Sequence, residues 1–184
     1  MNHHFNSAFR VADEQYGDAI LSALPMTLLK SGPLPRPPRM GALELRGALW
    51  VEVAAPGGEK VQIVTTHLGL LPNEHKLQVA ALMSRDWLGA EAFADPAILM
   101  GDFNATTRYA AYKRLAGAFN DLQMGHGVGA SPTFPARHPV LRIDHIFATP
   151  SVRCLDVWTP NGLLARAASD HLPLVADLAI SGAA

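Results

Sequence analysis

The chain has 184 residues, 49% of them hydrophobic and 17% charged, which is typical of a globular protein and not of a disordered one. With a formal net charge of −1, no overall positive field draws the chain to nucleic acids or membranes, although a bound metal ion could supply positive charge locally. The length fits a single domain over residues 1–184, no apolar run is long enough to span a membrane, and the lone cysteine, Cys154, fits a reducing, cytoplasmic compartment.

The N-terminal part of the chain is predicted to contain one short strand and one exposed connection. His3 and His4 lie in a polar stretch that we expect to be frayed. Residues 16–24 (YGDAILSAL) have a central apolar run and stop before Pro25, as a short strand would. Residues 30–40 are rich in proline and contain two arginines, which predicts a loop without regular hydrogen bonding.

A β-hairpin is predicted next. Residues 42–53 alternate between apolar and polar positions, which indicates a half-buried strand with Arg46 and two glutamates on its solvent face. Gly47 marks a bend or bulge in that strand. After a Pro-Gly-Gly turn, residues 61–66 form the returning strand.

The middle of the chain is typical of a crossover unit. Asn73 is expected to cap a helix that runs to about Phe93, and residues 98–100 (ILM) begin a buried strand. Strand, helix and strand in this order favour an α/β architecture.

The C-terminal part is predicted to hold a short helix, a loop and three strands. The helix covers residues 108–118, and the Gly- and Pro-rich loop over 125–139 contains His126 and His138. Strands are expected at 140–148, 152–158 and 172–180, the last of them apolar on both faces and therefore fully buried.

Polar residues stand at the ends of several predicted strands: His67, Asp102 with Asn104, Asp144, and Asp170 with His171. Each has an ordinary explanation, because His67 can be a buried core histidine, Asp144 can pair with Arg142, and Asp170 can cap a turn. The Asp102 stretch can likewise be a strand that ends in an Asx turn. Four such interruptions together favour an enzyme site, since strand ends are where sites assemble in layered α/β folds.

The motifs that carry these residues resemble a known family. GDFN at Gly101–Asn104, SDH at Ser169–His171, the RIDHIF strand and the TTHL histidine occur in the same order in the endonuclease/exonuclease/phosphatase superfamily, which includes pancreatic deoxyribonuclease. The YGDAILSALP stretch is similar to another strand of that family. The resemblance implies a four-layer α/β sandwich with mixed β-sheets.

The resemblance also implies roles for individual residues. Asp102 would activate the attacking water and Asn104 would orient it, while His171 would stabilise charge on the phosphate and Asp144 would hold His171. His67 would be a second phosphate-contacting imidazole. Asp170 would help to bind a divalent cation, Mg2+ or Mn2+, because the available ligands are hard oxygens. Arg142 and His138 are weaker candidates for substrate binding.

One family motif is not found in the sequence. In the family, a Gln-Glu motif with the principal metal carboxylate lies before the GDAILS-like strand, where this chain has only residues 1–15. We therefore expect the fold to be incomplete at its N-terminus, the isolated chain to be poorly active, and an exposed N-terminal edge to favour a homodimer.

The function predicted from the sequence is divalent-metal-dependent hydrolysis of a phosphoester or phosphodiester by an activated water. The substrate is open between nucleic acid, a small-molecule phosphate and a lipid headgroup. The alternative is a catalytically impaired family member that acts as a binding or assembly module.

Overall fold

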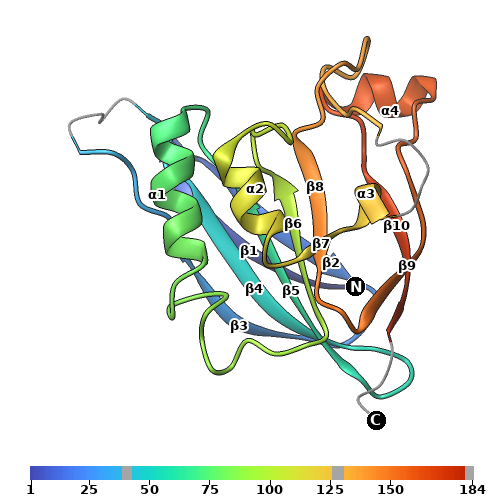
Figure 1. Cartoon of the computed structure of the whole chain (residues 1–184). Helices are drawn as coiled ribbons and strands as arrows, with labels where there is room; N and C mark the ends of the chain where they lie inside the picture. Colours follow the sequence, from blue (N-terminus) through green and yellow to red (C-terminus); the bar gives the residue numbers. More distant parts are fainter. Residues whose placement is uncertain (39–42, 126–130, 181–184) are drawn as a thin grey trace.

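The computed structural model describes residues 1–38, 43–125 and 131–180 and arranges their strands in one six-stranded sheet and two smaller sheets (Figure 1). In spatial order, the large sheet consists of β3 (Met26–Pro33), β4 (Gly47–Ala54), β5 (Lys60–His67), β6 (Ala97–Asp102), β8 (Asp144–Ala148) and β7 (Asn120–Asp121). The hairpin expected from the sequence is confirmed as the antiparallel pair β4 and β5.

The predicted crossover is also confirmed. Strands β5 and β6 are parallel and are joined through helix α1 (Pro72–Leu82). Their last residues, His67 and Asp102, are partners in the ladder. Strand β8 runs antiparallel on the other side of β6, so that its first residue, Asp144, is the ladder partner of Asp102. Three polar residues from distant parts of the sequence therefore meet where β5 and β6 end and β8 begins.

Helices α1 and α2 (Ala110–Ala116) lie on one face of the large sheet (Figure 1). The core beneath them contains Val64, Leu99 and Phe147, from three neighbouring strands, all with at most 1% of their surface exposed. The adjacent positions on the same strands point to the opposite face, as the two-residue period of a strand requires.

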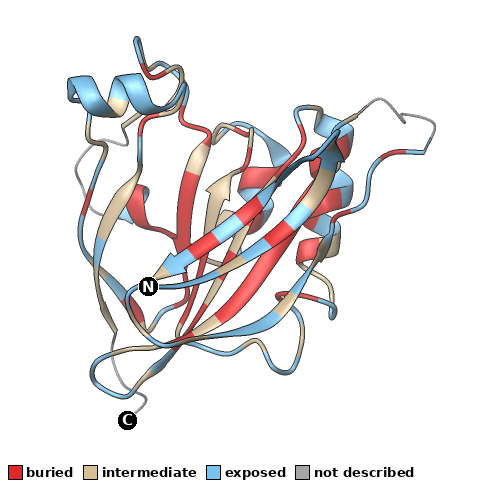
Figure 2. Cartoon of the chain, turned by 180° about the vertical axis from the view of Figure 1, so that it is seen from behind, coloured by how far each residue is buried: buried red, intermediate tan, exposed pale blue. Residues whose placement is uncertain are grey.

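The two-stranded sheets lie on that opposite face, which is turned to the viewer in Figure 2. Antiparallel β1 (Asn2–Val11) and β2 (Glu14–Ser22) form one of them, and β9 (Val152–Trp158) and β10 (Val175–Ile180) form the other. Two short helices, α3 (Leu122–Gly125) and α4 (Leu163–Ala168), complete the elements. The layered α/β fold expected from the sequence is confirmed.

Two predictions for the N-terminal third were wrong. Residues 2–11 are a strand and not a frayed end, because β2 pairs antiparallel with this polar stretch along its length, with one irregularity between Ser7 and Phe9. The predicted loop begins too early, since β3 continues to Pro33. Pro33 ends the strand at the sheet edge, where a residue without an N–H is tolerated.

Three boundaries further along the chain also differ. Helix α1 ends at Leu82 and is preceded by Leu71 as N-cap, so Asn73 does not cap it. Strand β8 begins only at Asp144. Strand β10 is not fully buried, because within the described residues it pairs only with β9, and most of its side chains are partly exposed.

In the part of the chain that the structure describes, no helix combines the length and the apolar character needed to cross a membrane.

Candidate active site

Asp102 and Asn104 come together through a turn at the end of β6. The strand stops at Asp102, and Asn104 has a φ of 48°, so the extended chain does not continue to Asn104. Instead, the backbone N–H of Asn104 donates to Oδ1 of Asp102 at 2.8 Å. This is an Asx turn, and asparagine tolerates its left-handed conformation better than most residues. An Asx turn at the end of the strand is therefore compatible with a role for Asp102 and Asn104 in an active site.

Gly101 allows β6 to deliver these residues close to β5. Its φ is +142°, and a Cβ added there would lie 1.9 Å from the backbone oxygen of Thr66. Both the backbone conformation and the space exclude a side chain at this position. The end of β6 can therefore lie directly beside His67.

His67, at the end of β5, contacts groups of opposite character through its two ring nitrogens. Nε2 lies 3.3 Å from Oδ2 of Asp102, and Nδ1 lies 3.0 Å from Nη1 of Arg46. Burial and the positive charge of Arg46 together lower the pKa of His67 to about 4. His67 is therefore uncharged at neutral pH.

The segment after His67 is tied to the Asx turn. The N–H of Leu68 donates to the backbone oxygen of Asp102 at 2.9 Å, and Nδ2 of Asn104 donates to the backbone oxygen of Leu68 at 2.9 Å. Because these bonds connect the ends of β5 and β6 beyond the sheet, they hold the two functional segments in one register.

His171 and Asp144 form a second pair in the same site. Nδ1 of His171 lies 2.8 Å from Oδ2 of Asp144, which also accepts a hydrogen bond from the hydroxyl of Thr133. Burial opposes the charged form of His171, but the hydrogen bond to Asp144 and the charge of that carboxylate outweigh it and raise the pKa of His171. The expected carboxylate–imidazole contact is present.

Asp102 lies between the two imidazoles. Its Oδ2 is 3.8 Å from Nε2 of His171, in addition to the contact with His67. Burial and the nearby charge of Asp144 raise the pKa of Asp102 to about 6, against the opposing effect of the hydrogen bond from Asn104. Asp102 is thus a stronger base than an exposed aspartate and is still ionised at pH 7.

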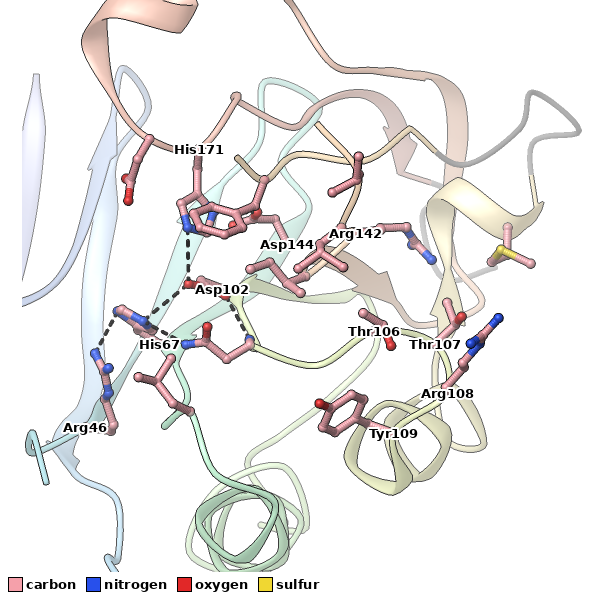
Figure 3. A pocket seen from close by; sticks show the side chains of 18 residues that line it. Arg46, His67, Asp102, Thr106, Thr107, Arg108, Tyr109, Arg142, Asp144 and His171 are labelled. Atoms are coloured by element: carbon pink, nitrogen blue, oxygen red, sulfur yellow. Dashed lines mark hydrogen bonds and ion pairs between the residues drawn. The ribbon is translucent and has the colours of Figure 1, made fainter. Parts of the chain in front are cut away.

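These side chains line one pocket with a volume of about 1230 Å³ (Figure 3). At one end lie the five predicted catalytic residues, His67, Asp102, Asn104, Asp144 and His171, together with Arg46. The rest of the wall includes Thr106, Thr107, Arg108 and Tyr109, from the segment between the Asx turn and α2. The cavity is therefore much larger than a phosphate group.

Three of the residues could hold a metal ion. Asp102, Asp144 and His171 each offer one ligand atom, and these atoms lie within 4.8 Å of one another. Two carboxylates and an imidazole form a donor set that suits Mn2+, and the carboxylates alone suit Mg2+. Asp170, the ligand predicted from the sequence, also lines the pocket, but it is exposed and lies outside this cluster.

The two candidates for substrate binding are placed differently. Arg142 does not pair with Asp144, because its guanidinium binds the buried Asp121 and the side chain of Gln123. It lines the pocket nevertheless. His138 is exposed and is not among the residues that line the pocket, while His126 lies outside the described residues.

Sequence reasoning missed two contributors to the site. Arg46 was assigned to the solvent face of its strand by alternation, but it precedes β4 and its side chain is only 8% exposed. Thr133 lies in the Gly- and Pro-rich loop, and no local pattern marks it as a partner of Asp144. Its segment is placed by backbone hydrogen bonds with residues 170–172, a long-range pairing that the sequence does not display.

Comparison with known proteins places the chain in a family. A family model described as Endonuclease/Exonuclease/phosphatase family matches residues 1–171. The uncharacterized protein YbhP of Escherichia coli K12 is 29% identical over 172 residues, which cover 89% of this chain and 62% of YbhP. The chain thus spans about three fifths of the length of this curated relative.

Solved structures show the same fold. An endonuclease/exonuclease/phosphatase from Bacteroides vulgatus matches with a TM-score of 0.77 and 20% identity, covering 98% of this chain and 76% of its own. The catalytic domain of human Nocturnin, with a bound sulfate anion, matches with a TM-score of 0.67 and 21% identity, covering 98% of this chain and 72% of its own.

Proposed function

Because the chain belongs to the Endonuclease/Exonuclease/phosphatase family, we propose that it hydrolyses a phosphoester or phosphodiester by attack of a water molecule. The observation that carries the proposal is the position of Asp102 Oδ2, 3.3 Å from Nε2 of His67 and 3.8 Å from Nε2 of His171. A carboxylate base flanked by two potential hydrogen-bond donors suits water activation beside a phosphoryl group.

Asp102 is the proposed base. A raised pKa of about 6 leaves the carboxylate ionised at neutral pH and makes it a better proton acceptor than an ordinary aspartate. Asn104, whose backbone N–H binds Oδ1 of Asp102, would orient the water or the phosphate.

His171 is the proposed donor to the phosphoryl oxygen. Asp144 accepts the hydrogen bond from Nδ1, which leaves Nε2 directed toward Asp102. The raised pKa of His171 favours a second proton on this ring, and hence a cationic donor where negative charge develops.

The carboxylates of Asp102 and Asp144, which lie in one cluster with His171, would hold a divalent cation, whereas a doubly protonated His171 would not ligate it because it has no free lone pair. When bound, Mg2+ or Mn2+ would act as a Lewis acid that polarises a phosphoryl oxygen. Asp170 stands at the same pocket and remains the further ligand that the SDH motif suggests.

The substrate is proposed to carry an organic group of substantial size, since the pocket of about 1230 Å³ is far larger than phosphate needs. Nocturnin binds a sulfate anion, and a tetrahedral anion of that kind agrees with a phosphoester ligand here. A net charge of −1 gives no particular preference for nucleic acid, so small-molecule and lipid-headgroup esters are equally within the proposal.

The test is hydrolysis of p-nitrophenyl phosphate and bis-p-nitrophenyl phosphate in Mn2+, in Mg2+ and with EDTA. We expect metal-dependent release of p-nitrophenolate from at least one ester, reduced about 100-fold or more in Asp102→Ala. Asp86→Ala, at an exposed position, serves as the matched control. Equal rates in wild type and Asp102→Ala would contradict the proposal, and the absence of both Mn2+ binding and turnover of either ester would favour the binding module.

A further inference from the structure

The Arg46 guanidinium contacts the ring of His67, and the proposed chemistry gives it no role. Its side chain is only 8% exposed, with Nη1 3.0 Å from Nδ1 of His67 and Nη2 2.8 Å from Oε2 of Glu44. Figure 3 shows the side chain reaching from the edge of the pocket to the far side of the His67 ring, away from Asp102.

The backbone around Arg46 is well anchored. Its carbonyl accepts a 2.7 Å hydrogen bond from Leu34, and the next carbonyl, of Gly47, accepts one of 2.8 Å from the hydroxyl of Thr66. Because Thr66 directly precedes His67, the anchor of Arg46 and the strand that carries the imidazole are linked to each other. The backbone that carries Arg46 is thus fixed relative to the strand that carries His67.

The contact determines which nitrogen of His67 carries the proton. A guanidinium has only donors, so Nδ1 must offer its lone pair to Arg46 and the ring proton must be on Nε2. Nε2–H then points to Oδ2 of Asp102, which can accept it at 3.3 Å. Both neighbours of the ring are satisfied by this tautomer.

The opposite tautomer conflicts with both neighbours. It would direct Nδ1–H against the N–H groups of Arg46 and the Nε2 lone pair against the Asp102 carboxylate. Its one gain would be a hydrogen bond from Nδ2 of Asn104, 3.2 Å from Nε2. The Nε2–H tautomer lacks this hydrogen bond, but the Asn104 amide still donates to the backbone oxygen of Leu68.

We propose that Arg46 is a positioning residue that holds His67 as the uncharged Nε2–H tautomer, so that His67 serves as a hydrogen-bond donor and not as a proton acceptor. The two imidazoles beside Asp102 then differ in the partner of Nδ1, which is the Arg46 guanidinium for His67 and the Asp144 carboxylate for His171. The donor role toward a phosphoryl oxygen rests on the proposed function, whereas the tautomer itself does not.

The tautomer is measured directly by long-range 1H–15N NMR on protein labelled with 15N-histidine. The His67 signals are assigned by their loss in His67→Asn. We expect wild-type Nδ1 to resonate in the unprotonated region and Nε2 in the protonated region at neutral pH. Wild-type signals that place the proton on Nδ1, or that show an even mixture of tautomers, would overturn the proposal.

The role of Arg46 is tested with Arg46→Met, which keeps an extended side chain but removes the donors. The single-tautomer signal should become a mixture in Arg46→Met and be restored at least in part in Arg46→Lys. It should stay unchanged in Arg114→Met, an exposed arginine on α2. An amide correlation spectrum confirms that each variant is folded. Glu44→Gln, which retains the arginine, should keep the wild-type tautomer. An unchanged Nε2–H signal in folded Arg46→Met would refute the role of Arg46 in selecting the tautomer.

Kinetics then separate this proposal from the proposed function. In an active enzyme, Arg46→Met should lower kcat roughly 10- to 100-fold, as loss of a group that orients another side chain does, with a smaller effect on KM. A change in KM alone would contradict the positioning role. Absence of turnover in the wild type would contradict the proposed function and leave the tautomer measurement as the decisive test of Arg46.

Discussion

At the scale of single residues, the pKa of each imidazole depends on the residue that contacts its Nδ1, Arg46 for His67 and Asp144 for His171. Burial and Arg46 lower the pKa of His67 to about 4, whereas the contacts with Asp144 overcome burial and raise the pKa of His171. Both rings lie within 3.8 Å of the same Asp102 oxygen. Titratable groups whose environments drive their pKa values apart are a common way to divide acid, base and donor roles in a site.

The residues at this scale were only partly predictable. Asp102, Asp144, His67 and His171 could be found because each interrupts an apolar strand at its end and belongs to a recognisable motif. Arg46 could not be found, because alternation predicts a solvent-facing side chain and nothing local shows that β5 brings His67 to it.

Metal binding can be assigned to particular residues by titration. The cluster predicts saturable Mn2+ binding that Asp144→Asn weakens roughly 10- to 100-fold, because one of its two carboxylate ligands is lost. Calorimetric titration measures the affinity. If Asp170→Asn abolishes binding and Asp144→Asn does not change it, the ligand inferred from the SDH motif is correct and the cluster assignment is wrong.

At the scale of secondary structure, the site is made where three adjacent strands of the large sheet begin or end. The parallel pair β5 and β6 brings His67 beside Asp102, and antiparallel β8 brings Asp144 to the other side. The hairpin, the crossover and strand β9 could be predicted because their apolar periodicity is strong. Strands β1 and β3 were not predicted, because pairing with β2 and β4, and not their own composition, makes them strands.

Gly101 is predicted to be essential to this strand junction. Gly101→Ala should destabilise the fold by about 2 kcal/mol or more, because its Cβ would meet the Thr66 oxygen at a φ of +142°. Thermal unfolding, monitored by circular dichroism, measures this change in stability. Gly162→Ala is the control, since no atom lies within 4 Å of a Cβ built there, and it should shift stability by less than about 0.5 kcal/mol. Equal melting temperatures for Gly101→Ala and wild type would contradict this account of the junction.

At the scale of the whole molecule, the pocket draws on residues from position 46 to position 171, so no short segment contains the site. The fold class could be predicted from the family motifs, and the layered arrangement follows from alternate burial on the strands of the large sheet. The substrate could not be predicted, because pocket size depends on loops whose placement rests on long-range pairing.

Stability should depend on pH through Asp18, a buried residue of β2. Burial raises its pKa from 3.8 to about 7 against the opposing charge of Arg46. Between these values the folded state binds more protons than the unfolded state, so stability falls as pH rises from about 4 to about 7. Asp18→Asn removes this proton linkage.

The melting temperature of Asp18→Asn relative to wild type should therefore increase between pH 4 and pH 8, by several degrees for a change on the order of a few kcal/mol. Asp13→Asn, at the exposed β1–β2 turn, is the matched control. A constant difference between Asp18→Asn and wild type across this range would show that Asp18 does not carry the linkage.

The central claim is that Asp102, between His67 and His171, is the base of a hydrolytic site. It is tested most directly by the rate of bis-p-nitrophenyl phosphate hydrolysis in saturating Mn2+ for wild type, Asp102→Asn and Asp86→Asn. Asp102→Asn preserves the shape of the side chain and removes its basicity, so we expect a loss of about 100-fold or more, with Asp86→Asn equal to wild type. A rate for Asp102→Asn within about twofold of wild type would contradict the claim.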